Sequence, residues 1–272
     1  MSETNDPTRW RDLIPWPGPD AHKHQRGRLG VVSGGMLHTG AARLAARAGL
    51  RVGAGLVRIL CPPDAGAVIA GAVEAVMVSD FKTPTALAKL AEPLACVVIG
   101  PAAGLTEATA KNLKALAGTK AALVVDADAL TLFKGRADEL FGCLDAEDLI
   151  TPHEGEFERV FPGLLERGRE AAAVEAARVC GAHVVLKGRE TVIAGPDGRV
   201  RVNQNGSPWL ATAGSGDVLA GLIGGLMAQK MEAFEAASAA VWMHADAAGR
   251  FGPGLTAEDL PGLIPAVLRD LA

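Results

Sequence analysis

The most informative segment of the chain is Ala211-Thr212-Ala213-Gly214-Ser215-Gly216-Asp217-Val218-Leu219-Ala220-Gly221. Gly214 and Gly216 flank a serine, which allows the backbone to turn sharply and to approach a ligand closely. The apolar run of small residues that follows, 218–228, predicts a buried helix whose first N–H groups would attract an anion. Asp217 stands at the same helix start and would repel that anion, so the site is poorly suited to holding phosphate alone. The arrangement suits a base that deprotonates a hydroxyl attacking a neighbouring phosphoryl group, although an ordinary helix N-cap is the alternative.

The composition favours a globular α/β enzyme. The chain has 272 residues, 49% of them hydrophobic and 21% charged, which fits one large domain or two small ones. Glycine accounts for 33 residues, well above the roughly 7% average, as is typical of the strand ends of phosphate-handling enzymes. Tyrosine is absent, aromatic residues total 4% and the net charge is −4, so we expect no nucleic-acid partner.

The cysteines and the hydropathy indicate a cytoplasmic protein. Cys61, Cys96, Cys143 and Cys180 form no Cys-x-x-Cys pair, which predicts four reduced thiols in a reducing compartment. The first seven residues are polar and acidic, unlike a signal peptide. The longest apolar run, 218–228, falls short of the ~20 residues of a membrane span, so no membrane association is expected.

The pattern along the chain predicts one α/β domain over 27–272, preceded by an irregular arm over 1–26 that is either a docking arm or a plain tail. We expect strands at 29–33, 56–61, 72–79, 95–100, 121–125, 149–151, 183–187, 191–194 and 199–203. We expect helices at 39–53, 84–92, 106–117, 166–180, 215–230 and 233–249. This alternation predicts a three-layer sandwich in which helices cover both faces of a mainly parallel sheet.

Five polar or glycine-rich loops follow the predicted strands, at 33–35, 100–104, 126–129, 151–156 and 187–191. In open α/β sheets, ligands bind outside the carboxyl ends of the strands. Any one of these segments could be an ordinary loop. Together with Gly-Ser-Gly-Asp they predict a binding site along this edge.

Individual residues in these loops have both a functional and a structural interpretation. Asp126 ends a strand and is either a site carboxylate or a helix cap, and His153 is either a ligand contact or a loop histidine. Lys187 could reach a phosphate as a point charge, or it is a solvated strand-end lysine. No His-Glu-x-x-His motif or Cys/His cluster predicts a transition metal. Mg²⁺ held by phosphates and water needs only one or two carboxylates, and Glu156 is a candidate in its outer shell.

These motifs, in this order, resemble the NAD(P)H-hydrate dehydratase family, a branch of the ribokinase-like small-molecule kinases. The similarity runs from about His24 to about Gly249. The segments that carry it are 22–30, 39–42, 48–57, 100–104, 125–130, 151–156, 187–191 and 205–221.

The resemblance implies a repair activity on NADH or NADPH that has added water across a ring double bond. Family members use ADP, in bacterial forms, or ATP, with Mg²⁺, to phosphorylate the new hydroxyl, and loss of phosphate then restores the dihydronicotinamide. The implied nucleotide contacts are Lys187, Gly188, Arg189, Glu190, Thr191, Gly214, Ser215 and Gly216. The implied hydrate contacts are Ala41, Gly104, Asp126, His153 and Asp217, with Asp217 as the base.

The chain departs from the family pattern in three ways. Family members more often have Gly-Gly-Thr-Gly-Asp where this chain has Ala213 to Asp217, and Trp209-Leu210 replaces a smaller pair beside the pocket. An epimerase domain is often fused at the N-terminus, and 1–26 is too short to hold it, so we expect epimerisation to come from another protein. The resemblance also implies a homo-oligomer, often a tetramer.

Two alternatives stay open at the sequence level. A vitamin-precursor kinase, of the hydroxyethylthiazole or pyridoxal kinase type, would leave its phosphate on the product. Related vitamin kinases commonly have Asn at the position of His153, which favours the dehydratase. A non-catalytic nucleotide-binding protein would have no use for the base Asp217.

Overall fold

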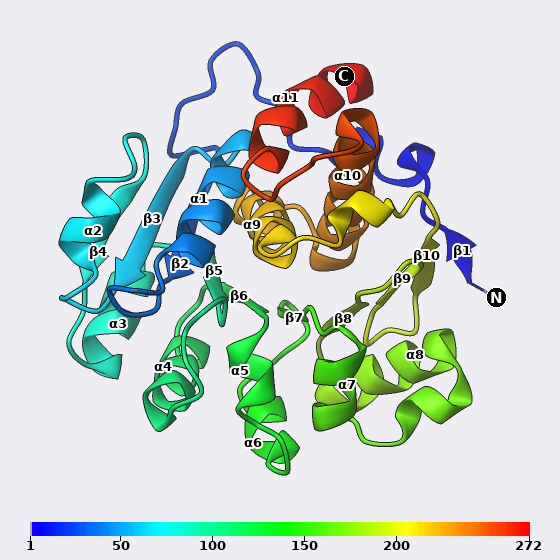
Figure 1. Cartoon of the computed structure of the whole chain (residues 1–272), viewed down its shortest axis with the longest axis horizontal. Coiled ribbons are helices and arrows are strands. Elements are labelled where there is room, and N and C mark those ends of the chain that lie inside the picture. Colours follow the sequence, from blue (N-terminus) through cyan, green and yellow to red (C-terminus); the bar gives the residue numbers. More distant parts are fainter. Residues whose placement is uncertain (1) are drawn as a thin grey trace.

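The fold is built on a ten-stranded sheet, seen here in a computed structural model that describes residues 2–272 (Figure 1). The strand order is β1-β10-β9-β8-β7-β6-β5-β2-β3-β4. Only the β8–β9 and β9–β10 pairs are antiparallel within this sheet. The strands are β1 Glu3–Thr4, β2 Arg28–Val32, β3 Leu56–Cys61, β4 Met77–Asp80, β5 Cys96–Ile99, β6 Ala122–Val125, β7 Leu149–Ile150, β8 His183–Leu186, β9 Thr191–Ala194 and β10 Val200–Asn203.

Helices cover both faces of this sheet and confirm the predicted three-layer arrangement. The helices are α1 Gly40–Arg51, α2 Gly66–Ala70, α3 Pro84–Ala91, α4 Glu107–Ala117, α5 Asp128–Thr131, α6 Ala137–Phe141, α7 Glu154–Val160, α8 Arg169–Cys180, α9 Ser215–Ala228, α10 Ala233–Phe251 and α11 Leu260–Leu271. One layer contains α1, α9, α10 and α11, and the other contains α3 to α8 (Figure 1). On β5, Cys96 and Val98 face the first layer whereas Val97 and Ile99 face the second, as the two-residue period of a strand requires.

Two predicted elements differ from the structure, and strand β1 and helices α2, α5, α6, α7 and α11 were not predicted. The strand expected at 72–79 is only β4, and helix α2 precedes it. The helix expected at 166–180 is divided into a short 3₁₀ turn, Leu164–Arg167, and α8, because Gly168 has a φ of 85° that ends the turn. Helix α11 was not predicted; Pro261 lies in its first turn, where proline is tolerated, and Pro265 lies inside it.

The N-terminal segment docks on the domain. Strand β1 adds to the sheet beside β10, and Trp10 is 0% exposed with its ring centroid 5.9 Å from that of Trp242. The Trp10 Nε1–H donates to Asn5 Oδ1, and the Asn5 amide donates to Asn203 Oδ1 at 2.9 Å. Residues 3–10 therefore pack on the domain, and the division of the chain into an arm over 1–26 and a domain over 27–272 stays a prediction.

Helix α9 runs unusually close to α1 because glycine faces it. A Cβ added at Gly221 would lie 2.2 Å from the Ala45 carbonyl oxygen, and one at Gly225 would lie 2.9 Å from Gly49 Cα. This contact fixes where the first turn of α9 points. It brings the Gly-Ser-Gly-Asp segment to the carboxyl edge of the sheet.

Two further features bear on the sequence predictions. In residues 2–272, no helix has both the length and the apolar character that a membrane crossing needs. All four cysteines are free thiols, and three of them are buried.

The glycine contact can be tested with a matched pair of variants. Gly221→Ala should destabilise the protein by about 2 kcal/mol, because the new methyl group overlaps a backbone carbonyl that cannot move aside. Gly249→Ala, in α10, meets no atom within 4 Å and should be neutral or stabilising by up to about 1 kcal/mol. Urea unfolding of both variants measures the difference. Equal stability would contradict the proposed close contact.

Candidate active site

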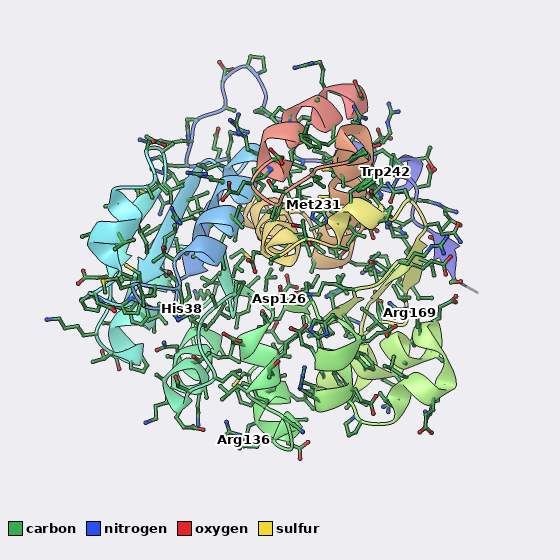
Figure 2. All side chains as sticks on the ribbon, viewed as in Figure 1. His38, Asp126, Arg136, Arg169, Met231 and Trp242 are labelled. Atoms are coloured by element: carbon green, nitrogen blue, oxygen red, sulfur yellow. The ribbon has the colours of Figure 1, made fainter. Side chains whose placement is uncertain are left out.

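Asp126, which lies near the centre of the view in Figure 2, forms an ion pair with Lys187 at the carboxyl edge of the sheet, between the ends of β6 and β8. The Lys187 ammonium donates to Asp126 Oδ1 at 2.8 Å and lies 3.8 Å from Glu156 Oε2. The side chains are 20% and 2% exposed, so the pair is shielded from water. Burial alone would lower the pKa of Lys187, but Asp126, Glu156 and Asp217 outweigh it and raise that pKa, which keeps the lysine charged.

Asp217 lies in the first turn of α9, beside this pair. Burial, together with the negative charges of Asp126 and Asp128, raises its pKa to about 6, although Lys187 acts in the opposite direction. A carboxyl with this pKa is deprotonated at neutral pH and still accepts a proton readily. Asp217 therefore has the properties of a general base.

Two glycines shape the start of α9. Gly214 is the N-cap and has a φ of 90°, a conformation that favours glycine. A Cβ added at Gly216 would lie 3.5 Å from Lys187 Nζ and 3.9 Å from Asp126 Oδ2. The first turn of α9, whose N–H groups have no partner within the helix, therefore faces the ion pair.

The loop after β8 is held in place by an arginine that the sequence did not single out. The Arg169 guanidinium, at the start of α8, donates to the carbonyls of Leu186, Lys187 and Glu190 and pairs with Glu154. A Cβ at Gly188 would lie 2.5 Å from Arg169 Nη2, so a glycine at position 188 gives the guanidinium room. The Thr191 hydroxyl closes the turn by donating to the Gly188 carbonyl at 3.0 Å.

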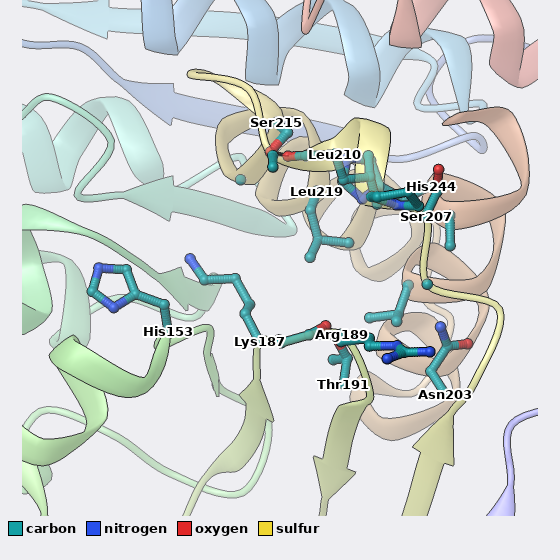
Figure 3. A pocket seen from close by; sticks show the side chains of 17 residues that line it. His153, Lys187, Arg189, Thr191, Asn203, Ser207, Leu210, Ser215, Leu219 and His244 are labelled. Carbon is teal, nitrogen blue, oxygen red and sulfur yellow. Dashed lines mark hydrogen bonds between the residues drawn. The ribbon is translucent and has the colours of Figure 1, made fainter. Parts of the chain in front are cut away.

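A cavity of ≈ 680 Å³ extends from Lys187 away from Asp126 (Figure 3). Its walls come from the ends of β8 and β10, the segment before α9, and one face of α10. The lining residues are His153, Lys187, Gly188, Arg189, Thr191, Asn203, Gly206, Ser207, Pro208, Leu210, Ala211, Ser215, Gly216, Leu219, Val241, His244 and Ala245. Lys187 and the first turn of α9 stand at one end of the cavity, and the rest of the lining combines apolar residues such as Leu210, Leu219 and Val241 with polar ones such as Arg189, Asn203 and His244.

Most of the residues predicted to contact the nucleotide line this cavity, and two of them do not. Lys187, Gly188, Arg189, Thr191, Ser215 and Gly216 line the cavity. Glu190 and Gly214 do not line it: Glu190 accepts from Arg169 through its carbonyl, and Gly214 caps α9. Glu190 and Gly214 therefore help to position the backbone segments that form the cavity walls.

His153 and Glu156 form a capping box at the start of α7. The Glu156 backbone N–H donates to His153 Nδ1 at 3.2 Å, and the His153 backbone N–H donates to Glu156 Oε2 at 2.8 Å. The His153 ring is 55% exposed and lines the cavity beside Lys187 (Figure 3). His153 thus caps α7 and also lines the cavity, while its contact with a ligand stays a prediction.

The remaining predicted residues lie on the side of the site away from the cavity. The Gly104 backbone N–H donates to Asp128 Oδ2 at 2.8 Å, which ties the loop after β5 to the loop after β6. Ala41 stands in the first turn of α1 and is partly buried. The structure therefore places Ala41, Gly104 and Asp126 on elements that meet at the carboxyl edge.

Several cavity residues were missed by the sequence reasoning. Val241, His244 and Ala245 share one face of α10 by their spacing of three and four, but that spacing is also typical of a buried core face. Burial lowers the pKa of His244 to about 4, so its ring is neutral. Asn203 is the last residue of β10 and belongs to no recognisable motif. Its side-chain oxygen accepts a hydrogen bond from the Asn5 amide in the N-terminal segment.

The described part of the chain contains no group of three His, Cys, Asp or Glu residues that could hold a metal ion. Glu156 Oε2 accepts from the His153 backbone, and Asp126 Oδ1 accepts from Ala127 N–H and Lys187. These residues fit an ion carried by bound phosphates and water, with carboxylates in its outer shell, better than a protein-bound ion.

Comparison with known proteins identifies the family. Residues 29–263 match the family model described as NAD(P)H-hydrate dehydratase. The chain is 37% identical over 260 residues to the ADP-dependent (S)-NAD(P)H-hydrate dehydratase of Neisseria meningitidis, covering 92% of this chain and 86% of that protein. It is also 37% identical over 276 residues to the bifunctional NAD(P)H-hydrate repair enzyme of Salinibacter ruber, covering 93% of this chain and 50% of that protein, so it spans about half the length of that relative.

A solved structure supports the same assignment. The ADP/ATP-dependent NAD(P)H-hydrate dehydratase from Bacillus subtilis, co-crystallised with ATP/Mg²⁺, superposes with a TM-score of 0.87 at 25% identity, covering 100% of this chain and 99% of that one. A ribokinase-like superfamily protein from Enterococcus faecalis superposes with a TM-score of 0.88 at 24% identity, covering 100% of this chain and 96% of that one, which confirms the predicted ribokinase-like fold. The chain belongs to the NAD(P)H-hydrate dehydratase family.

Proposed function

We propose that this chain is an ADP-dependent (S)-NAD(P)H-hydrate dehydratase. The observation that carries the proposal is Asp217, a carboxyl with a pKa of about 6, set beside Lys187 and the first turn of α9 at the open edge of the sheet. The names of the family and of the Neisseria meningitidis relative supply the substrate and the donor.

The donor nucleotide fits the ≈ 680 Å³ cavity with its phosphates at the Lys187 end. Lys187 and the N–H groups at the start of α9 supply positive charge there, and the apolar side chains of Leu210, Leu219 and Val241 on the cavity walls suit the base. The order of groups in the cavity therefore points the terminal phosphate toward Asp217.

The chemistry follows from this placement. Asp217 takes the proton of the ring hydroxyl as the hydroxyl oxygen attacks the terminal phosphorus of ADP, which releases AMP and leaves a phosphorylated hydrate. Lys187 and the helix N-terminus stabilise the charge on the transferred group. The C–O bond to phosphate then breaks and the adjacent ring carbon loses a proton, so the double bond returns and phosphate leaves.

Mg²⁺ is proposed as a companion of the nucleotide phosphates, where it would neutralise their charge. Asp126 and Glu156 lie 2.8 and 3.8 Å from Lys187 Nζ, at the end of the cavity proposed for the phosphates. They could therefore reach the water shell of the Mg²⁺ ion. The outer-shell role of Glu156 stays a prediction. The cytoplasmic setting and the tetramer, both expected from the sequence, also stay predictions.

The direct test is to incubate the protein with hydrated NADPH, Mg²⁺ and either ADP or ATP, and to follow the absorbance of the reduced nicotinamide. ADP should support turnover at least as well as ATP, with AMP as the product. Strong activity with ATP and none with ADP would contradict the donor. A stable phosphorylated product would instead favour a vitamin-precursor kinase, and nucleotide binding without turnover would favour a binding protein.

Lys187→Ala should weaken ADP binding about 10- to 100-fold and hydrate binding less, because a charged contact to phosphate is worth roughly 1.5–3 kcal/mol. It should also destabilise the protein, because Asp126, 1% exposed, loses its partner. The double variant Lys187→Ala/Asp126→Asn serves as the control: it should recover stability without recovering ADP affinity. Unchanged ADP affinity by calorimetry in Lys187→Ala would reduce the lysine to a structural partner of Asp126.

Asp217→Asn separates catalysis from structure. The N-cap of α9 is Gly214 and not Asp217, which corrects the N-cap interpretation of Asp217, so asparagine at position 217 should leave the helix start intact. Removing a carboxylate that sits next to phosphate should leave ADP binding unchanged or slightly tighter. Turnover should fall by at least ~10²-fold, the low end for a lost general base. Activity within a few-fold of the parent would show that Asp217 is only a helix-start residue. Loss of ADP binding would move the search for a base to Asp126.

The pH dependence follows from the raised pKa of Asp217. In the parent, kcat/KM should fall about tenfold per pH unit below pH 6, because the base becomes protonated. The same raised pKa means that the folded state binds the proton more tightly than the unfolded state, so Asp217 costs stability as the pH rises from about 4 to 6. Asp217→Asn should therefore unfold at a slightly higher temperature than the parent at pH 7. A parent profile that stays flat down to pH 5 would contradict the assignment.

A further inference from the structure

A second hollow lies on the same edge of the sheet, on the other side of Asp126 from the nucleotide cavity. It has a volume of ≈ 470 Å³ and is formed by the ends of β2, β3, β4 and β5 with the first turns of α3 and α4. These strands adjoin one another in the sheet order, whereas the nucleotide cavity lies over β8 to β10. The two spaces therefore flank the centre of the edge.

The lining of the hollow carries positive charge. The acids near it lie outside that lining: Asp64 is behind Gly35 and accepts from the Met36 backbone N–H at 3.2 Å, and Lys111 also borders a further hollow that contains Asp138 and Glu139. Lys82 and Lys111 line it, both are exposed, and none of the residues that line it is an aspartate or glutamate. The helices α3 and α4 begin at its wall, which adds the partial positive charge of two helix N-termini. Its floor includes Ser33, which is 3% exposed and whose hydroxyl has no hydrogen-bond partner. An anionic group with several acceptor oxygens satisfies all these features.

The hollow is connected to the reacting groups by one loop. Ala103 lines the hollow, and the next residue, Gly104, donates to Asp128, two residues after Asp126. The Thr109 hydroxyl, 3% exposed, contacts the carbonyls of Ala103 and Gly104 at 3.0 and 2.7 Å, which keeps this loop in place. A long ligand whose reacting ring lies at Asp217 can thus continue past this loop into the hollow.

We infer that this hollow binds the distal, adenylate half of the hydrated dinucleotide, with Lys82 and Lys111 on its phosphate groups. The inference rests on the proposed function, because it takes the acceptor to be a dinucleotide. The donor nucleotide occupies the space on one side of Asp217, so the tail of the acceptor has to leave on the other side. Lys82 and Lys111 then bind the acceptor at a distance from the chemistry.

The double variant Lys82→Ala/Lys111→Ala tests the assignment. We expect the KM for NADPH hydrate to rise about tenfold, while kcat and the KM for ADP stay within about twofold of the parent. The control is Lys114→Ala, because Lys114 lies on the same helix α4 and does not line this hollow. It shares with Lys111 the further hollow that is also lined by Asp138 and Glu139. The control should match the parent in every constant. An unchanged KM for NADPH hydrate in the double variant would overturn the inference.

The substrate itself can be shortened to locate the contact. The hydrate of reduced nicotinamide mononucleotide lacks the adenylate half, so parent and double variant should turn it over with the same KM. If the double variant instead raised the KM for this shortened hydrate as much as the KM for NADPH hydrate, the lysines would lie at the nicotinamide end and the inference would be overturned.

A comparison with NADH hydrate identifies the phosphate group that the lysines contact. If the double variant raises the KM for NADPH hydrate alone, the contact is with the 2′-phosphate. If it raises the KM for both hydrates equally, the contact is with the diphosphate.

A binding measurement separates this inference from the proposed function. Adenosine 2′,5′-bisphosphate, a probe for the distal half, should bind the parent in calorimetry and lose about tenfold in affinity in the double variant, even with ADP present at saturation. Displacement of the probe by ADP would place it in the donor cavity and contradict the inference. A parent that turns over no hydrate overturns the proposed function and this inference together, whereas an active parent with unaffected variants overturns this inference alone.

Discussion

A single buried lysine among carboxylates is the constraint on which this site depends. Lys187 contacts Asp126 and lies near Glu156, and its charge also lowers the cost of keeping Asp217 ionised nearby. Without the lysine, three carboxylates close together in a shielded site would repel one another. With it, the pKa of Asp217 is about 6, because the ammonium opposes part of the effect of burial and of the neighbouring carboxylates. In the proposed function, the same ammonium would be the charge that a phosphate meets on entering the cavity.

This arrangement requires backbone segments that are far apart in the sequence to lie at closely defined positions relative to one another. Gly221 and Gly225 let α9 lie against the backbone of α1, and this contact places the first turn of α9 above Lys187. On the other side, Arg169 holds the loop that follows Lys187 by three carbonyl contacts. Small residues and one guanidinium therefore position the reacting groups without touching a reacting atom.

The strand order divides the carboxyl edge of the sheet into three regions: the cavity, the Lys187–Asp126 ion pair and the second hollow. Strands β8 to β10 lie on one side of the ion pair, and strands β2 to β5 lie on the other. A donor bound over β8 to β10 and an acceptor bound over β5 to β4 approach Asp217 from opposite directions. Such an arrangement favours in-line transfer of a phosphoryl group, because the attacking and leaving oxygens are held on opposite sides of it.

The local signals in the sequence were sufficient for the layers and for the central part of the site. Alternating strands and helices predicted the mainly parallel sheet, and Gly-Ser-Gly-Asp predicted a helix start with an acid, since both depend on residues close in sequence. The signals failed where tertiary contacts outweigh local preference, as in α11 with its two prolines.

Only the tertiary structure showed that Lys187 pairs with Asp126, 61 positions away, and that His153 and Glu156 cap each other while facing the site. Only the tertiary structure connected Asn5 to Asn203 and made one face of α10 a cavity wall. The physical reason is that a pattern in sequence identifies which side chains will be buried or charged. Which partners they meet is decided by the packing of glycine-faced helices on the sheet, and that packing involves the whole chain.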